Sequence, residues 1–399
     1  MARTTIRRKS DAYFALIAAT LALAINFWAW SLISPLGIKY AEELKLSPSA
    51  LSLLLALPVL IGALGRIPLG LLTDRYGGKI MFAVVCFLTA IPTIGLAFSD
   101  SHLSLVFMAV LLGLGGASFT IGVPYISAWF PPRQQGIALG IYSLGNIGTA
   151  ISAFMTPRLA DLIGLNETFF MVATLLIIGS LVFSIWAKNS PSWHKPSNTV
   201  KQRILFATSQ RLTWDLSTVY IITFGALVAF GVYLPTLLKI SYNLSLTDAA
   251  SKAAGFVLLA ALARPLGGWL SDKFGGRKVI RVSLILIAVL ASVVALQTSL
   301  TIHTTTAYLS LAVVLGAANG AVFAMIGRLA KPGTVGGVSG IVGAIGGLGG
   351  FLPPLFLGIT YQATRSYSLA LIALTVCTVI VFIYISRRFT DISVYRKTA

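Results

Sequence analysis

Twelve long apolar stretches constrain the fold of this chain more than any other feature of its sequence. An α-helix needs about 20 mostly apolar residues to cross the hydrocarbon core of a bilayer. Stretches of about that length lie at 13–34, 51–72, 79–98, 103–126, 135–157, 168–187, 216–238, 253–271, 278–297, 305–327, 336–359 and 367–386. Only 10% of the 399 residues are charged, whereas soluble domains carry about 25%. The sequence therefore predicts an all-α integral membrane protein with twelve transmembrane helices.

The basic residues predict how these helices are oriented. Of the 30 Lys and Arg residues, 22 lie at the two termini and in the loops that share their side of the membrane. The opposite loops hold six: Lys39, Lys45, Arg158, Lys239, Lys252 and Arg365. The positive-inside rule then places both termini in the cytoplasm, in a multi-pass protein of the cell membrane. The basic residues face anionic headgroups of the lipid bilayer, so no nucleic-acid partner is expected.

Several other classes of protein are disfavoured by the sequence. The first apolar stretch is longer than the 7–15 residues of a signal-peptide core, so we interpret it as an uncleaved first helix. The two cysteines, Cys86 and Cys377, have neither metal-ligand spacing nor a disulfide framework. The run "GAIGGLGG" lacks the Lys-Ser/Thr ending of a phosphate-binding loop. We therefore expect no metal, no cofactor and no enzymatic activity, and a passive channel is the weaker alternative to a transporter.

The chain repeats itself at half its length. "RIPLGLLTDRYGGK" (66–79) aligns without gaps with "RPLGGWLSDKFGGRK" (264–278), and "GGASF" (115–119) resembles "NGAVF" (319–323). Two pseudo-symmetric six-helix halves are therefore expected, and such repeats place a substrate site near the bilayer midplane at their interface. The expected domains are an N-terminal half at 1–187, a cytoplasmic linker at 188–214 and a C-terminal half at 215–399.

The loop after the second expected helix resembles the signature loop of the major facilitator superfamily, and it recurs after the eighth. The resemblance implies the major facilitator fold. It also implies a cytoplasmic gate in which carboxylates and helix-end dipoles hold the two halves together, although these charges would equally serve as orientation signals. The residues concerned are Gly70, Asp74, Arg75, Gly77, Asp272 and Gly275.

Two arginines lie inside apolar stretches, at matching places in the two halves. Arg66 precedes Asp74 by eight residues, which is about 12 Å along an α-helix, and an isolated charge at membrane depth costs at least ~2.5 kcal/mol. All eleven acidic residues lie in loops or near the ends of stretches, at Asp11, Glu42, Glu43, Asp74, Asp100, Asp161, Glu167, Asp215, Asp248, Asp272 and Asp391. Unless Arg66 and Arg264 extend to the interface, they face one cavity, where two guanidinium groups suit an oxyanion.

Two glycine-rich segments indicate which family within this superfamily the chain resembles. "WFPPRQQGIALGIYSLGNIG" (129–148) and "GGVSGIVGAIGGLGGFLPP" (336–354) resemble the paired signature segments of the nitrate/nitrite porter family, and "NFWAWSLISPL" (26–36) is similar to that family's first helix. The signature glycines are Gly140, Gly145, Gly340, Gly343, Gly346 and Gly347. Tyr142 and Ser143 stand where many family members have a longer glycine run, which leaves the depth of Asn146 open.

The resemblance implies a secondary active transporter of nitrate, nitrite or both, working by alternating access and as a monomer. Another small inorganic or organic anion is the alternative substrate. The implied substrate-binding residues are Arg66, Arg264, Asn146, Tyr220, Phe224, Phe27 and Phe119. For Asn146 an interhelical hydrogen bond, and for the phenylalanines core packing, are competing explanations.

The coupling mode stays open at this stage. Repulsion between two unpaired arginines would hinder return of the empty carrier, which favours exchange of one anion for another. Proton symport is the competing mode, with protons as coupling partner. Proton pathways usually contain intramembrane Asp, Glu or His, and the three histidines, His102, His194 and His303, are expected in loops.

Overall fold

The structure, a computed structural model, describes residues 2–131, 134–195, 199–296, 300–330, 334–364 and 366–388. Within these ranges the regular secondary structure is entirely helical. Twelve helices are long and apolar enough to cross a membrane. The predicted fold class, an all-α protein with twelve membrane-spanning helices, is confirmed.

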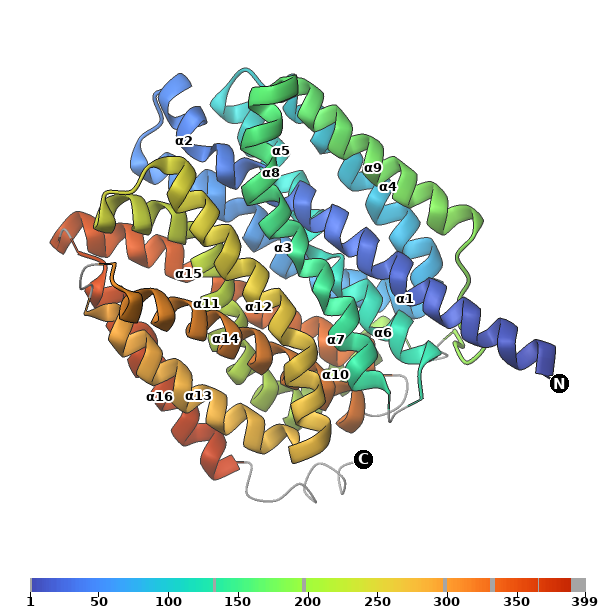
Figure 1. The fold of residues 1–399 in the computed structure, drawn as a ribbon. Coiled ribbons are helices and arrows are strands. Elements are labelled where there is room, and N and C mark those ends of the chain that lie inside the picture. Colours follow the sequence, from blue (N-terminus) through green and yellow to red (C-terminus); the bar gives the residue numbers. More distant parts are fainter. Residues whose placement is uncertain are drawn as a thin grey trace.

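The helices form two bundles joined by a short helix (Figure 1). The N-terminal bundle contains α1 (Ala2–Trp30), α2 (Ile33–Glu43), α3 (Pro48–Tyr76), α4 (Gly78–Leu96), α5 (His102–Ala117), α6 (Phe119–Trp129), α7 (Gln135–Ser143), η1 (Leu144–Asn146), α8 (Ile147–Ile163) and α9 (Leu165–Ile185). The joining helix is α10 (Val200–Ser209). The C-terminal bundle contains α11 (Arg211–Tyr242), α12 (Leu246–Phe274), α13 (Gly276–Ala295), α14 (Ile302–Leu329), α15 (Val335–Thr364) and α16 (Ser368–Arg388).

Three of the predicted spans are interrupted rather than continuous. The first breaks between α1 and α2, the fourth between α5 and α6, and the fifth at the 3₁₀ turn η1. At the first two breaks a serine hydroxyl bonds back to a carbonyl of the preceding turn: Ser31 to Phe27, at 2.8 Å, and Ser118 to Gly115, at 2.6 Å. Such bonds bend helices, and runs of apolar residues do not reveal them.

Other boundaries also differ from the sequence-based expectation. Helix α11 begins at Arg211, inside the segment expected to be linker, and α10 forms within that segment. His102 and His303 lie in the first turns of α5 and α14 instead of in loops. A helix that leaves the membrane continues through polar residues, so a hydropathy pattern underestimates its length.

Helices α3 and α12 show the internal duplication most clearly. Each has 29 residues, and their bounds differ by the same 198 positions that separate Arg66 from Arg264. Each ends at a glycine with positive φ, 84° at Gly77 and 87° at Gly275, a conformation that only glycine adopts readily. The two arginines therefore lie at equivalent depths.

Each arginine-bearing helix packs against the opposite bundle. Helix α3 contacts α15, and α12 contacts α7 and α8. Gly70 lies close to the carbonyl oxygen of Gly336, and Gly268 lies close to that of Gly136. Small residues permit this approach of helices. We call the end of the molecule where α1 begins and where α3 and α12 end the proximal face, and the opposite end the distal face.

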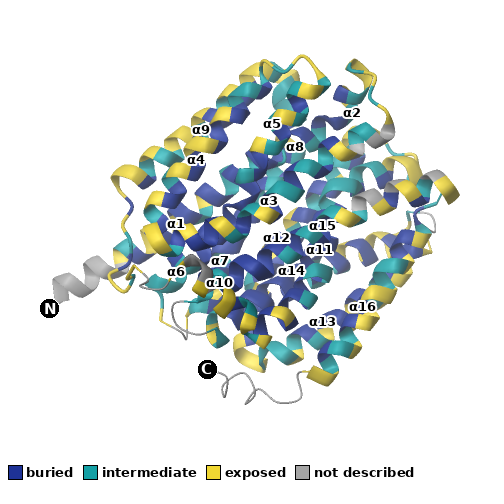
Figure 2. Ribbon diagram, turned by 180° about the vertical axis from the view of Figure 1, so that it is seen from behind, coloured by how far each residue is buried: buried dark blue, intermediate teal, exposed yellow. Residues whose placement is uncertain are grey.

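The burial pattern suits a bilayer. Buried residues lie in the centre, whereas α4, α9, α13 and α16 expose much of their surface (Figure 2). The exposed side chains on these outer helices include Phe87, Ile178, Val289 and Ile380. Apolar side chains that would aggregate in water can face lipid tails.

Replacing Gly267 by alanine should destabilise the protein. A Cβ at this position in α12 would overlap the backbone of Ala317 in α14, and overpacking of this kind costs about 1–3 kcal/mol. Among the described residues, no atom lies within 4 Å of a Cβ built on Gly255 in the same helix, so Gly255→Ala is the matched control. Thermal unfolding in detergent, followed by tryptophan fluorescence, should show a lower midpoint for Gly267→Ala alone. Equal midpoints would contradict this account of the packing.

Candidate functional site

Arg66 and Arg264 converge at the centre of the molecule. Their side chains are 2% and 0% exposed. The guanidinium carbon of Arg66 lies 4.7 Å from the centroid of the Phe224 ring, and that of Arg264 lies 5.6 Å from the same centroid. The two groups are thus no farther apart than the sum of these distances. The expectation that the two arginines face one cavity stays a prediction, because neither lines the cavity described below.

Backbone carbonyl groups, not carboxylates, contact Arg66. Its Nη1 donates a hydrogen bond to the carbonyl oxygen of Gly343 on α15, in the opposite bundle. Its Nη2 lies 3.5 Å from the carbonyl oxygen of Gly116, just before the break between α5 and α6. Its Nε has no hydrogen-bond partner among the described residues. These contacts orient Arg66 but do not neutralise its charge.

The side-chain N–H groups of Arg264 have fewer hydrogen-bond acceptors than those of Arg66. None of its three side-chain nitrogens makes a hydrogen bond of ordinary geometry within the described residues. The Tyr220 hydroxyl is close enough to interact with Arg264 both electrostatically and as a hydrogen-bond partner of poorer geometry, and the ring of Phe119 lies 5.9 Å from the Arg264 guanidinium carbon. A buried donor without a partner is costly, and a buried charge more so. The arrangement would accommodate an anion.

No carboxylate forms an ion pair with either arginine in the described part of the chain. Asp215 is fully buried, but it lies in the second turn of α11, accepts a hydrogen bond from Tyr384 and pairs with Arg211 and Arg388. Its charge is compensated locally, close to the proximal face.

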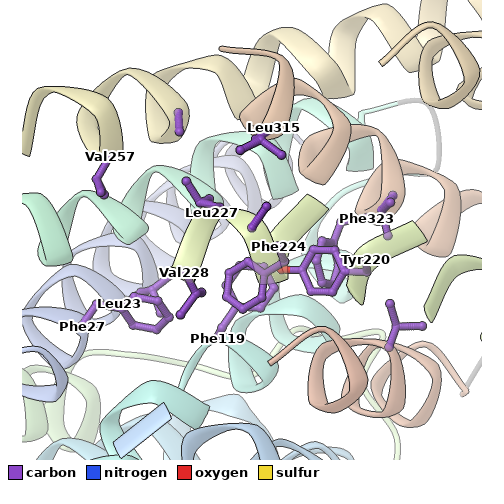
Figure 3. Close-up of a cluster of buried hydrophobic side chains, with 14 of the residues drawn as sticks. Leu23, Phe27, Phe119, Tyr220, Phe224, Leu227, Val228, Val257, Leu315 and Phe323 are labelled. Atoms are coloured by element: carbon purple, nitrogen blue, oxygen red, sulfur yellow. The ribbon is translucent and has the colours of Figure 1, made fainter. Parts of the chain in front are cut away.

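Phe119, Tyr220, Phe224 and Phe323 form an aromatic cluster (Figure 3), and the rings of Phe119 and Phe224 lie next to the arginines. Tyr220 and Phe224 stack with centroids 4.8 Å apart. Phe323 lies edge-on to Phe119 at 4.8 Å and to Tyr220 at 5.1 Å. Phe323 was not among the expected site residues. The resemblance of 115–119 to 319–323 contained the signal, because it aligns Phe323 with Phe119.

Tyr142 supports this aromatic cluster from the N-terminal bundle. Its hydroxyl donates to the carbonyl oxygen of Phe119, at 2.9 Å, and lies 3.3 Å from that of Ser118. Its ring stacks on Phe119 at 5.4 Å and occupies the space beside Gly122, where a Cβ would overlap it. The residue that departs from the family's glycine run thus hydrogen-bonds to the backbone at the break between α5 and α6.

A cavity lies on the distal side of Phe224. Its walls include Phe27, Trp30, Asn146, Thr149, Phe224, Leu227, Val228, Val257 and Ala261. Phe224 lines this cavity, and its ring also lies next to both guanidinium groups. The ring therefore lies between the cavity and the two arginines. Asn146 and Phe27 lie in the cavity wall, and Figure 3 shows Phe27 apart from the aromatic cluster. The Asn146 amide donates to the carbonyl oxygen of Ser143 at 2.8 Å.

The proximal face is closed by two pseudo-symmetric contacts. The Asp74 carboxylate lies against Gly336 at the start of α15, and the Asp272 carboxylate lies against Gly136 at the start of α7. Negative charge at a helix N-terminus is favourable. The Arg75 contact found among the described residues is local, because its guanidinium group lies 5.4 Å from the ring of the neighbouring Tyr76.

The signature glycines are positions of close helix contact. A Cβ on Gly340 would lie 3.2 Å from the backbone oxygen of Arg66, and one on Gly140 would lie 2.9 Å from the Cα of Pro265. Both contacts join the two bundles beside an arginine. The remaining contacts are of Gly343 with the Arg66 side chain, Gly346 with Tyr220, Gly347 with Ala63, and Gly145 with Thr20 and Leu23.

A helical fold with a central, charged site at the junction of two bundles defines a membrane transporter of the major facilitator type. The sequence profile described as Major Facilitator Superfamily matches residues 19–255 and 216–397. The human organic anion transporter MFSD10 (TETRAN) has a similar fold, with a TM-score of 0.76 at 12% identity over 94% of this chain and 99% of that one.

Curated relatives show to which family of this superfamily the chain belongs. The chain is 40% identical to the probable nitrate/nitrite transporter NarK2 of Mycobacterium tuberculosis, over 91% of this chain and 94% of the relative. It is 35% identical to the nitrite extrusion protein of Bacillus subtilis, over 89% of each. The probable nitrate/nitrite antiporter NarK1 of Thermus thermophilus is 33% identical over 68% of this chain and 64% of the relative. The chain belongs to the nitrate/nitrite porter family of the major facilitator superfamily, whose members are transporters and not enzymes.

Replacing Tyr142 by phenylalanine should destabilise the protein and weaken the site. Loss of the hydroxyl removes the buried hydrogen bond to the carbonyl oxygen of Phe119, at a cost of about 0.5–1.5 kcal/mol, whereas the carbonyl oxygen of Ser118 keeps its bond from the Ile121 N–H. We expect a lower unfolding midpoint and a lower transport rate. Tyr13→Phe, on an exposed part of α1, is the control. An unchanged midpoint for Tyr142→Phe would show that this hydrogen bond contributes little.

Proposed function

We propose that this chain is a secondary active transporter of nitrate, nitrite or both across the cytoplasmic membrane, and that it holds the anion between Arg66 and Arg264. The carrying observation is that two fully buried guanidinium groups converge over the ring of Phe224 without a carboxylate partner in the described residues. The relatives named nitrate/nitrite transporters support this substrate.

The chemistry of the site suits a small planar oxyanion. Guanidinium groups bind such anions through paired N–H···O bonds. Tyr220 can donate a further hydrogen bond, and the surrounding rings leave little room for a sugar phosphate or citrate. Asn146 would contact the anion in the cavity next to Phe224, before it reaches the arginines.

Alternating access follows from movement of two halves, 1–187 and 215–399, in a monomer. If both termini are cytoplasmic, the cavity opens to the outside and the Asp74 and Asp272 contacts form the cytoplasmic gate. The Arg66 bond to Gly343 crosses between the bundles. An anion that accepts this donor would compete with Gly343, so anion binding and opening of the cytoplasmic side would be coupled.

Exchange of one anion for another is the coupling mode that the site favours. Without an anion the two arginines repel each other, which raises the energy of the empty carrier during its return. Proton symport, the competing mode, usually requires intramembrane carboxylates or histidines. The Thermus relative named an antiporter also supports exchange.

Replacing either arginine by lysine should abolish transport. An ammonium group keeps the charge but lacks the planar pair of donors, and loss of charged hydrogen bonds weakens binding by about 10–100-fold. The measurement is [¹⁵N]nitrate counterflow in proteoliposomes, with Arg387→Lys at the end of α16 as control. Asn146→Ala should weaken binding less, by about 5–10-fold. Normal counterflow by Arg264→Lys would contradict the proposal that the anion binds between the two arginines.

Uptake into proteoliposomes should require an internal anion. With nitrite inside, external nitrate should enter rapidly at equal pH on both sides. With no internal nitrate or nitrite, an acidic exterior alone should produce no uptake, because the empty carrier returns slowly. Uptake driven by the pH gradient alone would establish symport instead.

A further inference from the structure

Residues Lys188–Trp193, which we call the strap, follow α9 and cross the proximal face of the N-terminal bundle. Two serine hydroxyls of the strap, Ser190 and Ser192, donate to the carbonyl oxygen of Ala128 on α6, at 2.7 and 2.5 Å. The Tyr125 hydroxyl donates to the carbonyl oxygen of Lys188 at 2.8 Å. The strap is thereby fixed to α6 at several points.

Two side chains of the strap contact the turn between α3 and α4. The Asn189 Oδ1 accepts a hydrogen bond from the backbone N–H of Lys79, at 3.1 Å, and so caps the first turn of α4. The same side chain fills the space where a Cβ on Gly77 would lie. The Trp193 Nε1 donates to the carbonyl oxygen of Asp74 at 3.2 Å.

The equivalent turn of the C-terminal bundle follows α12 and contains Gly275. Gly275 has nearly the same φ as Gly77, 87° against 84°, yet no described atom lies within 4 Å of a Cβ built on it. The two gate carboxylates are alike, since each lies at the start of a helix in the opposite bundle. The two turns differ at their glycines, because Asn189 fills the space beside Gly77 and no described atom fills the space beside Gly275.

We propose that Asn189 and Trp193 are positioning residues of the gate, which hold the turn after α3 so that Asp74 stays at the N-terminus of α15. A carboxylate on a fixed turn loses less conformational freedom when it meets the helix end than one on a free turn. The strap therefore stabilises the state that is closed at the proximal face. The inference rests on the proposed alternating access, but not on the identity of the anion.

Spin labels on the two bundles test this inference without substrate. With Cys86 and Cys377 replaced by alanine, labelled cysteines at the exposed positions Ile80 and Val282 report the separation of α4 and α13 by pulsed electron resonance. Asn189→Ala and Trp193→Phe should each raise the ratio of proximally open to closed protein by about 3–10-fold, the effect of one lost hydrogen bond. His194→Ala, an exposed neighbour, should leave the ratio unchanged.

Two further variants separate positioning from general stability. Asn189→Asp keeps an acceptor oxygen and should restore the closed distribution. In an Asp74→Asn background, Asn189→Ala should add nothing, because the contact it supports is already lost. Additive effects of Asn189→Ala and Asp74→Asn, or equal effects of Asn189→Ala and His194→Ala, would overturn the proposal. Since these distances need no anion, failure of nitrate transport would leave the result interpretable.

Discussion

The burial of two permanent positive charges without a carboxylate is the constraint on which the rest of the structure depends. A guanidinium group stays protonated inside a protein, so Arg66 and Arg264 must be compensated by dipoles, by aromatic faces or by an anion. The aromatic cluster supplies faces for both. Only Arg66 also receives carbonyl dipoles within the described residues.

Interrupted and glycine-rich helices supply those dipoles. The break at Ser118 leaves carbonyl groups of α5 and α6 available to Arg66 and Tyr142, as broken helices do in other transporters. Gly340 and Gly343 let α15 approach Arg66 closely enough for a backbone oxygen to reach it. The break between α5 and α6 and the close packing of α15 therefore both bring backbone carbonyl groups to Arg66.

The sequence predicted what periodicity and duplication determine: the number of spans, the pairing of Arg66 with Arg264, and their lack of acidic neighbours at that depth. It did not predict the breaks, because Ser31 and Ser118 bend helices through hydrogen bonds that hydropathy does not register. Phe323 was missed because its partners Phe119 and Tyr220 come from distant helices. The sequence left the depth of Asn146 open, and η1 places Asn146 in the cavity wall.

The duplication is exact in position but not in environment. Arg66 and Arg264 occupy the same place in helices of equal length, yet Arg66 bonds across the bundles, whereas Arg264 makes no hydrogen bond of ordinary geometry in the described residues and interacts with Tyr220 of its own bundle. An incoming anion would therefore meet less competition at Arg264, and would gain Arg66 only by displacing Gly343. In the proposed transport, the two arginines would therefore have different roles. Arg264 would bind the anion first, and Arg66 would couple anion binding to the contact between the bundles.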